Sequence, residues 1–157
     1  MPQFNRQRKE MVDLLRERGI TDSKVLATFA IVDRHLFVPR AFQGRAYDDC
    51  ALPIGCSQTI SQPYTVAFMT ACLNVQKGDK VLEVGTGSGY QAAILAEMGA
   101  QVIKVEPSGL GDSARQAGPF PGDIPNPEAS GLFLYLNTGK KSITLDLKSV
   151  TGQEILK

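Results

Sequence analysis

The chain has few of the residues that mark metal sites, membrane spans or nucleic-acid-binding surfaces. His35 is its only histidine, and Cys50, Cys56 and Cys72 form no CxxC pair, so no metal site is expected. No apolar run approaches the roughly 18 residues that a membrane-spanning helix needs. Lysine and arginine number 17 against 16 acidic residues, a net charge of +1. This balance gives no general attraction to nucleic acid or to a membrane, so neither is expected as a partner.

The N-terminal stretch and the cysteine count predict a cytoplasmic location. Residues 1–19, MPQFNRQRKEMVDLLRERG, carry charges through what would be the apolar core of a signal peptide. An odd number of cysteines fits small buried thiols in a reducing compartment. A catalytic pair of one cysteine with His35 is the alternative that these residue types leave open. With 43% hydrophobic and 21% charged residues, the chain is typical of a globular domain.

The first 75 or so residues are predicted to be mainly helical. One helix is expected over residues 4–18, and a second from a cap at Thr21, Asp22 or Ser23 to about Val32. Residues 40–62 are expected to be loop with short extended pieces, and Pro63 opens a third helix. The residues expected to face inward on the second and third helices are Val25, Leu26, Phe29 and Ile31, and Val66, Met69, Thr70 and Leu73.

A strand, a glycine-rich turn, a helix and a second strand follow. The strands are expected at Lys80–Val84 and Gln101–Glu106, with the helix at Gln91–Met98 between them. This order predicts a parallel sheet and an α/β, Rossmann-like fold. Residues 107–131 hold five prolines and five glycines and predict a long surface loop or disorder.

The last part of the chain is expected to regain regular structure. Leu132–Leu136 is predicted to be a short helix or strand, and Ser142–Leu147, SITLDL, alternates as a strand does. A final helix is expected to start at Ser149 or Thr151.

The turn Gly85-Thr86-Gly87-Ser88-Gly89 has the chemistry of a nucleoside-binding loop. Glycines between a strand and a helix let a ligand approach bare backbone, and the helix N-terminus favours an anion. Glu106, 21 residues after Gly85 at the end of the next strand, is placed to bind ribose hydroxyls. Tyr90 stands where the dinucleotide fingerprint needs glycine, so a dinucleotide is disfavoured. A tight turn that binds nothing is the alternative.

Several blocks in order closely resemble bacterial protein-L-isoaspartate O-methyltransferases, a family of class I methyltransferases. These blocks are RERGI (16–20), RHxFVP (34–39), AYxD (46–49), LPIGxxQTISQPY (52–64) and EVGTGSGYQ (83–91), within a resemblance over about residues 8–106. The resemblance implies S-adenosylmethionine as the cofactor and L-isoaspartyl residues of damaged proteins as the substrate. A carboxylate substrate is already ionised at neutral pH, so the lack of a catalytic triad is no objection.

The same resemblance assigns roles to residues. It implies that Ser61 lies at the reacting group; from the residues alone, Ser61 could instead cap the helix that begins at Pro63. The implied cofactor-binding residues are Thr59, Ile60, Glu83, Gly85, Thr86, Gly87, Ser88, Gly89 and Glu106. One departure is Ser57, where the family usually has glycine. If this position needs a positive φ, serine there costs about 1 kcal/mol or more.

From about residue 99 onward the chain resembles a second family. VIKVEP (102–107), GDxAR (111–115), GPFPGD (118–123) and LNxxKKSITLDLK (136–148) resemble the N-terminal part of family III CoA-transferases. In that family this region belongs to the CoA-binding fold, and the catalytic aspartate comes much later. Lys140 and Lys141 could contact a phosphate or lie in a solvated turn.

The chain is therefore interpreted as a chimera joined within MGAQVIKVEP, residues 98–107. We expect residues 1–106 to be the first part of a methyltransferase domain and residues 107–157 to be a dependent segment that adds SITLDL as a third parallel strand. A sheet of three central strands leaves edges and apolar faces less covered than a full doubly wound sheet. Three functions stay open: isoaspartyl methyl transfer, an inert or cofactor-binding-only fragment, and a CoA-binding fragment.

Overall fold

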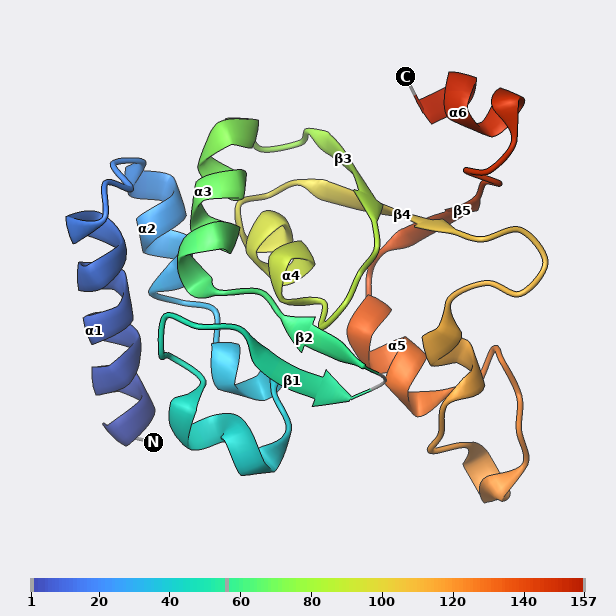
Figure 1. The fold of residues 1–157 in the computed structure, drawn as a ribbon, viewed down its shortest axis with the longest axis horizontal. Helices are drawn as coiled ribbons and strands as arrows, with labels where there is room; N and C mark the ends of the chain where they lie inside the picture. Colours follow the sequence, from blue (N-terminus) through green and yellow to red (C-terminus); the bar gives the residue numbers. More distant parts are fainter. Residues whose placement is uncertain (1, 56, 157) are drawn as a thin grey trace. The chain divides into compact units, whose positions relative to one another are not determined.

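A computed structural model describes residues 2–55 and 57–156 (Figure 1). The chain falls into two compact units. The N-terminal unit comprises Met1–Lys80 and Gly87–Gln101, and the sheet unit comprises Val81–Thr86 and Val102–Lys157. Each unit is described by itself. Within the described residues, no helix is both long enough and apolar enough to cross a membrane.

The N-terminal unit is built mainly of helices that begin and end where the residues favour it. Asp22 caps α2 by accepting hydrogen bonds from the backbone N–H groups of Lys24 and Val25. Pro63 occupies the first turn of α3, where no backbone N–H is needed, and Asn74 ends this helix in a left-handed conformation. The helices of this unit are α1 (Pro2–Glu17), α2 (Ser23–Phe29), α3 (Pro63–Leu73) and α4 (Tyr90–Glu97), with 3-10 turns η1 (Arg34–Phe37) and η2 (Arg40–Arg45).

A short antiparallel hairpin precedes α3. It pairs β1 (Leu52–Gly55) with β2 (Gln58–Ile60), and the register shifts between Pro53 and Gly55. The loop-rich region expected over residues 40–62 is therefore confirmed. Ser57 lies between β1 and β2 and has a φ of +55°, the left-handed value on which the predicted cost of this serine depends.

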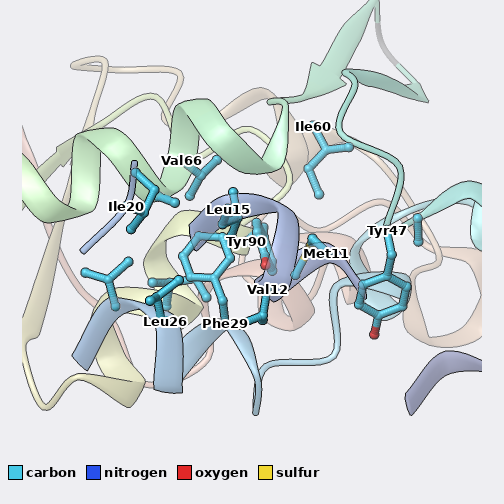
Figure 2. Packing of buried hydrophobic residues seen from close by; sticks show 14 of the residues in the cluster. Met11, Val12, Leu15, Ile20, Leu26, Phe29, Tyr47, Ile60, Val66 and Tyr90 are labelled. Carbon is cyan, nitrogen blue, oxygen red and sulfur yellow. The ribbon is translucent and has the colours of Figure 1, made fainter. Parts of the chain in front are cut away.

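One hydrophobic core holds the N-terminal unit together. Phe29 and Phe37 both pack edge-on against the ring of Tyr90, with ring centroids 5.9 and 5.4 Å away. Figure 2 shows side chains from the four helices of this unit and from the hairpin packed in a single cluster. Its buried members are Met11, Val12, Leu15, Ile20, Val25, Leu26, Phe29, Val38, Ala46, Tyr47, Leu52, Ile60, Val66, Ala67, Tyr90 and Ile94.

Three residues expected in the core are exposed instead. Ile31 is exposed because α2 ends at Phe29, short of the predicted Val32, so helical spacing no longer applies to it. Met69 and Leu73 are exposed because the buried side of α3 is formed by Pro63, Val66, Ala67 and Thr70. The sequence PYTVAFMTACL is apolar almost all round, so its pattern does not select one face.

The sheet unit contains three strands in the order β3-β4-β5. Their bounds are β3 (Lys80–Val84), β4 (Gln101–Glu106) and β5 (Lys141–Thr144). β5 runs parallel to β4, with Val105 opposite Ile143 and Glu106 opposite Thr144. The predicted third parallel strand is confirmed, but it ends at Thr144 and not at Leu147, because its partner β4 ends at Glu106.

The chain between β4 and β5 is a long excursion, coloured from yellow to orange in Figure 1. It contains the 3-10 turns η3 (Ser113–Gln116) and η4 (Pro121–Asp123), and then α5 (Gly131–Asn137), which settles the predicted choice between helix and strand. The last helix, α6, spans Val150–Leu156, and the hydroxyl of Ser149 accepts a hydrogen bond from the N–H of Gly152. Of the two predicted starts of this helix, Ser149 and Thr151, the structure therefore has the cap at Ser149.

The sheet is incompletely covered, as expected for so few strands. Leu82 and Val84 of β3 are 43% and 53% exposed, and Ile143 of β5 is 41% exposed. The central strand differs, because Lys104, Val105 and Glu106 are all buried in succession. Two of these three buried residues are charged, so polar pairing has to stabilise the interior of this unit.

Candidate cofactor and substrate residues

The glycine turn has the backbone that only glycine adopts easily. Gly85, Gly87 and Gly89 have φ values of +84°, +53° and +78°. A Cβ atom added at Gly85 or Gly87 would meet no atom within 4 Å. The need for glycine here is therefore conformational, and the backbone at both positions faces open space. These are the properties that a ligand-binding turn requires.

Glu83, near the end of β3, is partly buried and paired. Its Oε2 accepts hydrogen bonds from Thr86 Oγ1 and from Lys140 Nζ, both at 2.8 Å. The side chains of Lys140 and Glu83 are only 8% and 10% exposed. Burial lowers the pKa of Lys140. Lys140 therefore does not lie in a solvated turn, and its amino group is paired with Glu83, whereas the neighbouring Lys141 is exposed.

Lys104 is a member of this site that the sequence did not single out. Its Nζ lies 2.5 Å from Thr86 Oγ1 and also pairs with the carboxylate of Asp112. Its side chain is 3% exposed. The available signal was a lysine inside the apolar strand sequence VIKVE, because a buried charge needs a partner.

Glu106, expected to bind ribose, has both carboxylate oxygens occupied. Its Oε2 accepts from Arg115 Nε at 2.7 Å and from the backbone N–H of Asp112 at 2.9 Å. Its Oε1 accepts from Arg115 Nη2 at 2.9 Å and from Ser142 Oγ at 2.5 Å. The bonds from Arg115, and then those from Ser142 and Asp112, hold the pKa of Glu106 down at about 2. All four donor groups follow Pro107 in the chain.

The residues expected at the substrate lie in the hairpin. Thr59 and Ser61 are exposed, whereas the side chain of Ile60 packs into the core. The carbonyl oxygen of Ser61 accepts a hydrogen bond from Arg34 Nη2 at 2.8 Å. The residue that caps α3 is Gln62, so Ser61 is not in the capping position.

The predicted cofactor residues are divided between the units. Thr59, Ile60, Gly87, Ser88 and Gly89 belong to the N-terminal unit. Glu83, Gly85, Thr86 and Glu106 belong to the sheet unit, where the structure brings Glu83 and Thr86 into contact.

The lone histidine and the described cysteines have ordinary surroundings. His35 stacks on Phe4 with ring centroids 4.0 Å apart, and its Nδ1 lies 2.9 Å from the hydroxyl of Tyr47. Burial lowers the pKa of His35. Cys50 is half-buried and Cys72 is exposed, so the expectation of three buried thiols is wrong for Cys72. Cys56 lies outside the described residues.

Comparison with protein families gives two overlapping matches. The family of protein-L-isoaspartate(D-aspartate) O-methyltransferases (PCMT) matches residues 6–108, and CoA-transferase family III matches residues 77–157. The overlap contains β3, α4 and β4. The second match begins earlier than the predicted residue 99, so the segment compatible with both families is wider than the junction strand.

Individual curated proteins match the first part of the chain. The protein-L-isoaspartate O-methyltransferase of Salinibacter ruber is 58% identical over 103 residues, which cover 66% of this chain and 45% of that protein. The enzyme of Methanoculleus marisnigri is 57% identical over 102 residues, covering 64% and 46%. The chain therefore spans about half the length of the curated relatives it matches.

Two solved protein-L-isoaspartate O-methyltransferase structures are also similar to this chain. A protein-L-isoaspartate O-methyltransferase from Plasmodium falciparum, in complex with S-adenosyl-L-homocysteine, is 30% identical with a TM-score of 0.53, covering 62% of this chain and 48% of that one. A second protein-L-isoaspartate O-methyltransferase structure gives a TM-score of 0.62 at 21% identity, covering 89% and 42%. This second likeness shows the fold alone, and the predicted Rossmann-like α/β class is confirmed.

Proposed function

This chain belongs to the protein-L-isoaspartate(D-aspartate) O-methyltransferase family through residues 6–108 and to CoA-transferase family III through residues 77–157, and from this we propose S-adenosylmethionine-dependent methylation of L-isoaspartyl residues as its function. The observation that carries the proposal is the family match across both the TISQPY block and the glycine turn. Isoaspartyl-containing proteins or peptides are the proposed substrates. The cytoplasm is the proposed location, and the net charge of +1 gives no general attraction to nucleic acid or to a membrane.

The residues present suit this reaction. S-adenosylmethionine supplies a methyl group on a positively charged sulfur, and the leaving group is the neutral sulfide. The substrate carboxylate oxygen forms the new bond to carbon as the carbon–sulfur bond breaks, and no proton has to move. The chain's task is then to align the two groups and exclude water. We assign the open backbone of Gly85 and Gly87 to the methionine part, Glu106 to the ribose and the hydroxyl of Ser61 to the isoaspartyl carboxylate.

Methyl transfer to a synthetic peptide tests the proposal. Labelled methyl groups from S-adenosylmethionine should reach a peptide that contains L-isoaspartate and not the same peptide with ordinary aspartate. Ser61→Ala should lower the transfer rate while leaving the affinity for S-adenosylhomocysteine within about twofold. Gly87→Val should abolish binding of S-adenosylhomocysteine, because a branched side chain fills the open space and resists a positive φ. Equal labelling of both peptides would refute the substrate assignment.

Cofactor binding without turnover is a second candidate. The partial span of the first family match favours it, because that match ends at residue 108 and covers about half the length of the curated relatives. Binding of S-adenosylhomocysteine with no methyl transfer would select this function. A CoA-binding function is less well supported, because Lys140 is committed to Glu83. Displacement of bound S-adenosylhomocysteine by CoA would support the CoA-binding function.

A further inference from the structure

The four hydrogen bonds on Glu106 use the acceptor capacity of its carboxylate completely. A carboxylate offers about four lone-pair directions, two on each oxygen. Arg115 Nε and the Asp112 N–H take those of Oε2, and Arg115 Nη2 and Ser142 Oγ take those of Oε1. Ribose hydroxyls bind such an acid by donating to these same directions. A bound nucleoside and the present contacts therefore exclude each other.

We propose that Arg115 sets the cofactor affinity of this chain by competing with the ribose hydroxyls for Glu106. Residues 111–142 thereby act as an internal competitor at the nucleoside site. This inference rests on the proposed function for the identity of the ligand, but the competing contacts lie wholly within the sheet unit. A guanidinium that forms two parallel bonds to a carboxylate is a strong competitor, since both bonds are charge-assisted.

Arg115 is held in place on its other sides. Its guanidinium carbon lies 3.7 Å from the centre of the Phe133 ring, and its Nη1 is 3.0 Å from Glu128 Oε1. The hydroxyl of Ser130 lies 2.7 Å from the carbonyl oxygen of Ala114, within η3, and 2.5 Å from that of Ala117, directly after it, and its one proton is shared between these acceptors. The competitor is therefore preorganised, and displacing it breaks several contacts.

The backbone at Gly111 lies close to the ion pair of Arg115 with Glu106. A Cβ atom at Gly111 would lie 2.9 Å from Arg115 Cδ and 3.0 Å from Glu106 Oε2. Real Cβ atoms essentially never show the first distance, and the second is tighter than nine in ten of their contacts, so the Arg115 side chain would have to shift from its present position. Gly109 is a matched control, because it also has a positive φ, +87° against +67° for Gly111, and a Cβ there meets nothing within 4 Å.

The test is calorimetric titration of the full chain with S-adenosylhomocysteine. Gly111→Ala should bind at least about tenfold more tightly than the unchanged chain, whereas Gly109→Ala should match it. Arg115→Lys is a second variant that keeps the positive charge but cannot bond both oxygens in parallel, and it should also gain affinity. Far-ultraviolet circular dichroism checks that each variant is folded.

The ligand itself provides a further control. The gain in Gly111→Ala and Arg115→Lys should appear with adenosine and be absent with 2′,3′-dideoxyadenosine, which lacks the two hydroxyls. Equal affinity of all chains for S-adenosylhomocysteine would overturn the competition and leave the proposed function standing. Failure of every chain to bind it at millimolar concentration would overturn the proposed function, and the competition with it.

Discussion

Arg34 donates a hydrogen bond from Nη2 to the carbonyl oxygen of Ser61, at 2.8 Å, from a side chain that is completely buried. Its Nε donates to the carbonyl oxygen of Ala46 at 2.7 Å, and its guanidinium lies 4.8 Å from the centre of the Tyr90 ring. One side chain thus joins the loop after η2, the end of the hairpin and the start of α4. Burial lowers the pKa of Arg34 and raises that of Tyr90.

Replacing Arg34 by methionine should lower the free energy of unfolding by about 3 kcal/mol. The change leaves two carbonyl oxygens without their donors and removes the contact with Tyr90. Urea denaturation measures the loss, and Arg40→Met, at an exposed arginine, should stay within about 0.5 kcal/mol of the unchanged chain. Equal stability of Arg34→Met and Arg40→Met would show that Arg34 does not hold Ser61.

Ser57→Gly should stabilise the chain by about 0.5–1 kcal/mol. Ser57 has a φ of +55°, which costs an L-residue about 1 kcal/mol, and the greater freedom of glycine in the unfolded chain offsets part of the gain. The midpoint of urea unfolding reports the change. Ser108→Gly, at an exposed serine for which no positive φ is found, should have the opposite sign or no effect. A loss of stability in Ser57→Gly would mean that the serine makes a compensating contact.

Lys140→Met should destabilise the chain by about 3 kcal/mol, because it leaves the carboxylate of Glu83 buried without its ionic partner. The neighbouring Lys141→Met replaces an exposed lysine and should have little effect. Combining Lys140→Met with Glu83→Gln should restore part of the loss, since no buried charge is then unpaired. Additive losses in the double variant would contradict a direct interaction.

Low pH should lower the free energy of unfolding, because it protonates the carboxylate of Glu106. Because Arg115, Ser142 and Asp112 hold the folded-state pKa at about 2, below the usual 4.5, the stability gained from this carboxylate is complete above pH 4.5. It is lost as the pH falls from 4.5 toward 2. The shift corresponds to about 3 kcal/mol. Urea unfolding of Glu106→Gln should show a flatter pH dependence over that interval, and identical slopes for the two chains would refute this contribution.

The helices and strands of this chain could be predicted from its sequence better than its side-chain contacts could. The strands at Lys80–Val84 and Gln101–Glu106 lie where they are predicted, beside the glycine-rich turn and the helix that separate them. These features depend on near neighbours in the chain, and both families share this β-α-β segment.

The pairings of the candidate site could not be predicted in the same way. Glu106 meets Arg115 across nine residues and Ser142 across 36. Such contacts depend on how the loop after β4 folds back, and periodicity carries no information about that. The resemblance to a methyltransferase pointed to Glu106 as a cofactor ligand, whereas its actual partners come from the part of the chain that matches the other family.

The titration of the Glu106 carboxyl carbon, followed by ¹³C nuclear magnetic resonance, tests most directly whether this residue is held by the C-terminal segment. The contacts with Arg115, Ser142 and Asp112 predict a midpoint near pH 2, and Gly111→Ala should move it toward the ordinary value while Gly109→Ala leaves it unchanged. A midpoint near 4.5 in the unchanged chain would contradict the account, because Glu106 would then be free to bind a ribose.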